Sequence, residues 1–189
     1  MKYIPHGCNL NYMSHSQWEK KKGKKASQGD RISKLYTKLV RVITLEAKKS
    51  GGNRESPGLK IAIQKARDVD MPNDNIERAI KKATETADQF ERMTYEAYGP
   101  GGVGIIIEAL STNRNKAAQE IKHILSEHGT AFAGIGAVTW GFTKIDNEWT
   151  PTMTIPLTDE DREKLEELID ELEENDEVQA VFTNLEQTS

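Results

Sequence analysis

The chain has 189 residues, of which 36% are hydrophobic and 30% charged, a composition typical of soluble globular proteins. Its longest apolar runs, such as Ile105–Ile107, fall far short of the roughly 18 residues that a membrane span needs. A single cysteine, Cys8, excludes an internal disulfide framework. Residues 1–12 resemble neither a secretory signal nor an Arg-rich transit peptide, so we expect a cytoplasmic protein that binds no membrane, with a mitochondrial location as the alternative in a eukaryote.

The net charge of −4 conceals a strong segregation of charge along the chain. Residues 1–82 hold 14 Lys and 5 Arg against 8 acidic residues, whereas residues 83–189 hold 7 basic against 22 acidic residues. This segregation predicts different partners for the two halves, and the natural partner of the basic half is a polyphosphate such as nucleic acid. Residues 157–189, with 13 acidic and 2 basic residues, would repel nucleic acid.

The first half of the chain predicts a basic arm followed by helices. Residues 1–29 show no sustained period and are rich in Lys, which predicts a flexible arm. Residues 30–83 carry three apolar stripes at helical spacing, beginning near Asp30, at Ser56-Pro57 and after Met71-Pro72-Asn73. They predict a three-helix bundle, and residues 84–93 predict a polar linker.

From Thr94 the apolar period changes from 3.6 to 2, which predicts strands. Expected elements are strands near 95–98, 103–110, 138–142, 149–155 and 178–182, with helices after residues 116 and 158 and a hairpin turn at 146–147. After one extra leading strand the order is βαββαβ, so residues 94–189 predict a ferredoxin-like domain. The fold class is therefore α+β.

Cationic side chains gather in the arm and the first predicted helix. Arg31, Lys34, Lys38 and Arg41 recur at steps of 3, 4 and 3, so they form one stripe that can meet successive phosphates. A solvated basic surface is the simpler alternative. The candidate nucleic-acid-binding residues are His15, Trp18, Lys20, Lys21, Lys22, Lys24, Lys25, Arg31, Lys34, Lys38, Arg41, Lys60, Arg114 and Lys116.

Two of these candidates have alternative interpretations that the sequence leaves open. Trp18, in a cationic stretch, can stack on a nucleobase or fold back onto the bundle. Arg114 and Lys116 begin a predicted helix whose free N–H groups suit an anion, although capping by Asn113 is the simpler account.

Catalytic and cofactor motifs are weak. The run Gly99–Gly104 precedes a strand instead of a helix, so it predicts a tight turn and not a phosphate-binding loop. His6 and Cys8 do not make a zinc site, and His123 and His128 are spaced too far around a helix to share a metal. We expect no enzyme activity, no cofactor and no metal.

Several long segments, in the correct order, resemble the YebC/PmpR family. Its motif HSKW appears here as residues 15–18, FTKL as 36–39, MPKDNIERAIKK as 71–82, YEGYGPGG as 95–102 and EALTxNRNR as 108–116. Members of the family carry an additional domain after the strand that contains Trp140. In this chain Phe142 leads almost directly to Trp149, so the chain resembles a short form that lacks the inserted domain.

The resemblance implies nucleic-acid binding without catalysis. It implies either DNA-binding transcriptional regulation or action on the ribosome, including relief of stalls at proline-rich sequences. The residues of this chain favour a translation factor that contacts ribosomal RNA or tRNA. One alternative is a DNA-binding transcriptional regulator, and another is a protein–protein adaptor that uses the acidic half. A Lys-rich arm with one aromatic residue suits irregular RNA better than duplex DNA. We expect a monomer.

Overall fold

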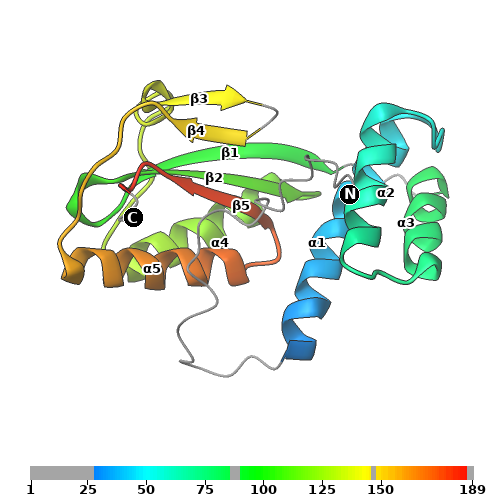
Figure 1. The fold of residues 1–189 in the computed structure, drawn as a ribbon, viewed down its shortest axis with the longest axis horizontal. Coiled ribbons are helices and arrows are strands. Elements are labelled where there is room, and N and C mark those ends of the chain that lie inside the picture. The colour runs from blue at the N-terminus through cyan, green and yellow to red at the C-terminus, as the bar shows by residue number, and fades with distance from the viewer. Residues whose placement is uncertain (1–27, 86–89, 146–147, 187–189) are drawn as a thin grey trace, which may run out of the picture.

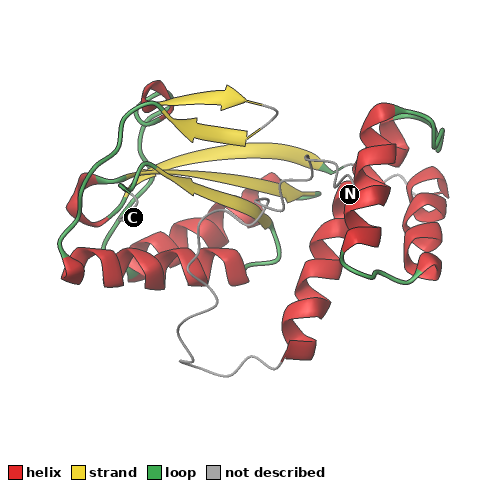
Figure 2. Cartoon of the chain, in the orientation of Figure 1, coloured by secondary structure: helices red, strands yellow, loops and turns green. Residues whose placement is uncertain are grey.

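A computed structural model describes residues 28–85, 90–145 and 148–186 (Figures 1 and 2). Its helices are α1 (Gln28–Lys49), α2 (Pro57–Asp68), α3 (Asn73–Glu85), α4 (Arg114–Glu127) and α5 (Asp159–Glu174). Its strands are β1 (Glu91–Tyr98), β2 (Gly104–Ser111), β3 (Phe142–Ile145), β4 (Glu148–Pro151) and β5 (Val178–Thr183). No helix in these ranges is long and apolar enough to cross a membrane.

Helices α1, α2 and α3 form the predicted bundle. The Ser56 hydroxyl accepts a hydrogen bond from the Leu59 N–H, and Pro57 occupies the first turn of α2, which fixes where that helix begins. The Tyr36 hydroxyl donates to the Asp70 carbonyl at 2.9 Å and ties α1 to the turn before α3. The core consists of aliphatic side chains: Leu39, Ile43, Ala47, Leu59, Ala62, Ile63, Ala66, Met71, Ile76, Ala79, Ile80 and Ala83.

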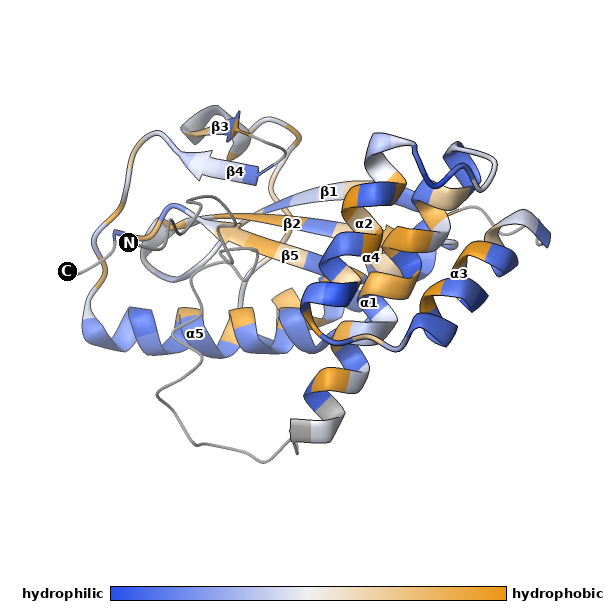
Figure 3. Cartoon of the chain, turned by 45° about the vertical axis from the view of Figure 1, so that its right-hand side comes forward, coloured by the Kyte–Doolittle hydropathy of each residue, from blue (hydrophilic) through white to orange (hydrophobic). Residues whose placement is uncertain are grey.

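The second half is built on a three-stranded antiparallel sheet in the order β1-β2-β5. Helices α4 and α5 cover one face of this sheet, and the β3–β4 hairpin lies over the other (Figure 1). Ile105 and Ile107 of β2 pack toward the helices, whereas Ile106 packs with Phe142 on the hairpin side. Strand β2 is hydrophobic over most of its length because both of its faces are covered (Figure 3).

The α+β class and the order of elements along the chain are confirmed. Within that class, β1 occupies the edge of β2 that a ferredoxin-like sheet gives to the hairpin, and β3 and β4 form a separate two-stranded sheet. The hairpin is attached by side chains, because Glu108 of β2 accepts hydrogen bonds from Lys144 Nζ and Trp149 Nε1, both at 3.0 Å.

Other boundaries differ from the sequence prediction in detail. Strand β1 begins at Glu91, within the predicted linker 84–93, of which residues 86–89 lie outside the described ranges. The predicted hairpin turn at 146–147 also lies outside them. The strand expected from residue 138 begins only at Phe142, because residues 139–141 form a 3-10 turn.

A buried carboxylate explains that 3-10 turn. Glu96 of β1 is 7% exposed, and its carboxylate accepts hydrogen bonds from the N–H groups of Gly136, Val138 and Thr139 at 2.7 to 2.9 Å. Burial by itself raises the pKa of Glu96, but these backbone donors outweigh it and hold the pKa below its ordinary value. The charged side chain therefore fixes residues 136–139 against the sheet.

Candidate nucleic-acid interface

The structure describes seven of the predicted nucleic-acid-binding residues. Arg31, Lys34, Lys38 and Arg41 lie on α1, Lys60 lies on α2, and Arg114 and Lys116 lie in the first turn of α4. The remaining candidates lie outside the described residues: His15, Trp18, Lys20, Lys21, Lys22, Lys24 and Lys25.

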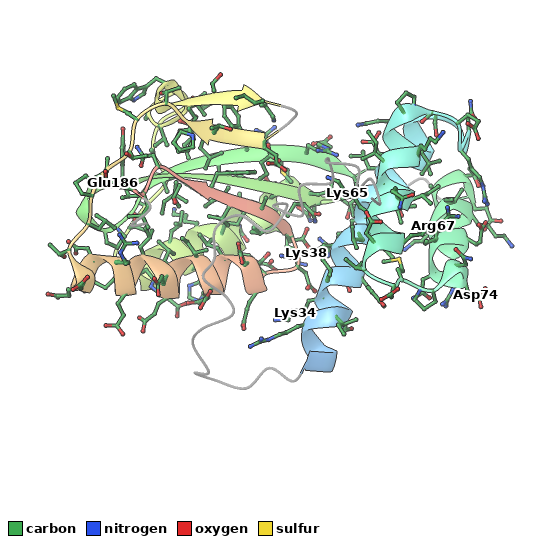
Figure 4. All side chains as sticks on the ribbon, viewed as in Figure 1. Lys34, Lys38, Lys65, Arg67, Asp74 and Glu186 are labelled. Atoms are coloured by element: carbon green, nitrogen blue, oxygen red, sulfur yellow. The ribbon has the colours of Figure 1, made fainter. Side chains whose placement is uncertain are left out.

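The four cations on α1, which we call the α1 stripe, face the last turn of α5 and the residues that follow it. Lys34 and Lys38 project from the side of α1 that is turned toward the α/β domain (Figure 4). Lys34 Nζ lies 3.8 Å from a carboxylate oxygen of Glu174. Arg31 is close enough to Asp170 to lower the pKa of its carboxyl, although burial and neighbouring acids raise that pKa overall. The stripe thus meets the chain's own acidic residues.

Lys38 is the most enclosed amine of the stripe. Its Nζ donates to the backbone carbonyl of Glu173 at 2.7 Å. Burial lowers the pKa of Lys38, and the negative charges of Glu173 and Asp176 offset that effect only in part. The Lys38 amine therefore loses part of the hydration that an isolated surface lysine keeps.

Arg41 ends the stripe at a polar cluster beneath β2. Its guanidinium lies 3.0 Å from the Glu177 carboxylate and donates to the Leu110 carbonyl at 3.2 Å. Lys116 of α4 reaches the same carboxylate at 3.2 Å. Burial by itself raises the pKa of Glu177. Hydrogen bonds from Ser111 and Lys116 and the charge of Arg41 outweigh burial and hold this pKa below its ordinary value. Glu177 thus joins the bundle to the α/β domain.

Two further charge contacts bridge the same halves. Glu46 near the end of α1 lies 3.5 Å from the Arg92 guanidinium of β1. Burial lowers the pKa of Lys65 of α2, and the nearby charge of Glu148 of β4 offsets that effect in part. Charged side chains of both halves therefore contribute several of the described contacts between the bundle and the α/β domain.

This arrangement adds a contact that the charge segregation alone does not predict. The basic and acidic halves were expected to meet different partners, yet their charged surfaces meet each other. A signal for it is present in the sequence, since acids occur at residues 170, 173, 174 and 177 with helical spacing that complements the α1 stripe. Amino-acid composition alone does not show that these acids contact the α1 stripe.

The other predicted residues lie in ordinary surface settings. Lys60 is exposed, and its amine lies 3.9 Å from the Glu55 carboxylate. Asn113 caps α4, because its side-chain oxygen accepts from the Lys116 N–H at 3.0 Å, which confirms the capping interpretation. Nucleic-acid binding by Arg114 and Lys116 stays a prediction, and at Lys116 a phosphate would compete with Glu177.

The described residues offer little for metal or phosphate-loop chemistry. They contain no group of three or more His, Cys, Asp or Glu side chains that could hold a metal ion. Residues 100–102 form a turn with positive φ at Gly101 and Gly102 and lead into β2, so the tight turn is confirmed. The arrangement supports recognition by charge.

Fold and site together define a two-part α+β protein, in which a helical bundle contacts an acidic α/β domain through ion pairs. Residues 16–86 match the family model of the TACO1/YebC protein N-terminal domain, and residues 90–145 and 142–185 match that of the TACO1/YebC second and third domain. The chain belongs to the TACO1/YebC family, as its motifs predict.

Similar proteins are regulators by name. A "Probable transcriptional regulatory protein" of Halothermothrix orenii is 47% identical over 133 residues, which cover 69% of this chain and 53% of that protein. Another with this name, from Fervidobacterium nodosum, is 34% identical over 232 residues, covering 90% of this chain and 92% of that protein. The crystal structure of a conserved hypothetical protein, Aq1575, from Aquifex aeolicus superposes with a TM-score of 0.78 at 28% identity, covering 90% and 97% of the two chains.

The comparisons also show where this chain is shorter. It spans about half the length of the Halothermothrix relative that it matches, at 53%. The Fervidobacterium alignment runs over 232 residues, more than the 189 of this chain. The two segments that match the second-and-third-domain model meet at residues 142–145, which are β3. The short form predicted from the sequence is thus shown, and the hairpin stands where relatives carry additional residues.

Proposed function

We propose that this protein is a non-catalytic nucleic-acid-binding regulator, and that its target is ribosomal RNA or tRNA. The observation that carries the proposal is the concentration of cations in residues 20–41 of a chain whose net charge is −4. The names of its relatives, which describe regulatory proteins, support a regulatory role over a catalytic one. Binding to the ribosome at proline-rich stalls is the finer form of this proposal.

A DNA-binding transcriptional regulator is the second candidate. The printed names of the relatives favour it, since they describe probable transcriptional regulation. The two candidates predict different retention of the full chain. An RNA-binding factor co-sediments with ribosomes in a sucrose gradient at physiological salt, whereas a DNA-binding regulator stays out of those fractions and retains a specific promoter fragment.

Salt and charge variants test the proposal itself. If the basic residues bind phosphates, affinity for tRNA falls steeply with salt, with a log–log slope that corresponds to about five or more phosphate contacts. Replacing Lys21, Lys22, Lys24 and Lys25 with Glu should abolish that affinity. If the variant binds as the parent does, the adaptor function of the acidic half replaces the proposal.

A further inference from the structure

The side chains expected to meet phosphates are already paired with carboxylates of the same chain. Lys34 lies against Glu174, Lys38 against the end of α5, and Arg41 against Glu177. We propose that residues 170–177 act as an internal competitor for the α1 stripe, so that a polyanion and this acidic segment occupy the stripe in turn. The inference rests on the proposed function and concerns regulation of the same surface.

The contact lies outside the three buried clusters, although two further buried leucines, Leu45 of α1 and Leu110 of β2, belong to none of them. Among the described residues, the buried clusters of the bundle and of the α/β domain share no member, so each half keeps its core when they separate. Polar interfaces between domains typically permit relative motion.

The strength of the contact is graded along the stripe. The side chains of Lys34 and Glu174 are 41% and 64% exposed, and exposed ion pairs of this kind are weak because water screens them. Arg41 and Glu177, at 17% and 6%, are far less exposed and form the firmer end. A polyanion can therefore displace the acids first near Lys34 and last near Arg41.

Lys38 makes the exchange favourable for a strong polyanion. In the closed contact its amine is partly buried and donates to an uncharged carbonyl at 2.7 Å, with the charges of Glu173 and Asp176 nearby. A phosphate offers a full negative charge and several acceptor oxygens, which bind an ammonium group more strongly than a neutral carbonyl does. The acidic segment thus covers the stripe, but at Lys38 it offers a weaker hydrogen-bond acceptor than a polyphosphate would.

The test compares two pairs of neutral substitutions on α5. Glu173→Gln/Glu174→Gln weakens the acidic segment. The matched control, Glu163→Gln/Glu167→Gln, removes the same charge from exposed residues about two turns or more nearer the start of the helix. Both variants change the net charge equally, so the difference between them reports the acids that lie next to the stripe. The probes are inorganic polyphosphate, bulk tRNA and duplex DNA.

If the acids compete, the Glu173→Gln/Glu174→Gln protein binds polyphosphate about 3- to 10-fold more tightly than the control variant. Adding Lys34→Ala and Lys38→Ala should remove that gain. Equal or weaker binding relative to the control, or a gain that survives loss of both lysines, overturns the competition. If polyphosphate shows the gain while neither tRNA nor DNA binds any variant, the competition stands and the proposed function fails.

Discussion

The two halves of this molecule bury alanine and large aliphatic side chains in different proportions. The α/β domain is built around large aliphatic residues, with Ile107, Ile121, Leu125 and Leu168 all fully buried. In the bundle, five of the buried core residues are alanines: Ala47, Ala62, Ala66, Ala79 and Ala83. Small residues let helices approach closely, whereas large ones fill the space between a sheet and its helices. Each half therefore closes its own core, and charge is left to join them.

The largest loss of stability should come from truncating a side chain in the core of the α/β domain. Leu168→Ala removes a fully buried side chain from α5, which should lower the free energy of unfolding of the α/β domain by about 2–5 kcal/mol. Denaturant unfolding followed by Trp fluorescence reports this domain through Trp140 and Trp149, and circular dichroism also reports the bundle. If the halves are separate units, a second transition keeps its midpoint. One shared transition would contradict the comparison.

A smaller loss should follow Glu96→Gln. The amide cannot accept from all three N–H groups as the carboxylate does, so we expect a cost of about 2–3 kcal/mol. Because folding lowers the pKa of Glu96, its contribution is present above its ordinary value of 4.5 and is lost as pH falls through the folded-state pKa. Stability measured from pH 7 to pH 3 should decline less in the variant, and parallel curves would contradict this account.

The contact between the halves is tested by Arg41→Gln. The variant leaves Glu177 paired with Lys116 but removes the guanidinium that links α1 to β2, at a cost of about 1–2 kcal/mol to the contact. In small-angle scattering, the radius of gyration of the variant should increase as the two halves separate. This increase should begin at a lower salt concentration than in the parent protein. Arg67→Gln, on the exposed side of α2 (Figure 4), removes the same charge and should leave the radius unchanged.

The smallest expected effect lies within the bundle. Tyr36→Phe removes a hydroxyl that donates to the Asp70 carbonyl, at a cost of about 1 kcal/mol or less. The thermal midpoint of the bundle should fall by a few degrees, while the affinity for polyphosphate stays as in the parent. A change in affinity without a change in midpoint would place Tyr36 in the binding surface instead.

Sequence periodicity predicted the elements with strong local signals. Ser56-Pro57 marks the start of α2, Asn113 caps α4 as expected, and α5 follows Thr158 as predicted. The separate hairpin was missed, because strand order depends on which edge of β2 is filled and no local pattern records that. Glu96 was missed because a lone acid in a strand looks like an exposed one. Its three donors come from residues about forty positions later.

The sequence predicted which residues form the candidate site but not which residues contact them. The α1 stripe follows from helical spacing and lies on one side of α1, as expected. What covers it depends on tertiary packing that brings residue 38 to residue 173, a separation of 135 positions. Such pairings between distant charges require a fold before they can be assigned.

The β3–β4 hairpin has a consequence for how this family can change its size. Phe142 and Pro151 pair directly, so the chain leaves and re-enters the body at one point. Attachment through Glu108, Lys144 and Trp149 spares the hydrogen-bonded ladder of the main sheet. A domain can therefore be inserted or deleted at the hairpin without changing how β1, β2 and β5 pair. This makes the hairpin a suitable junction for engineered chimaeras.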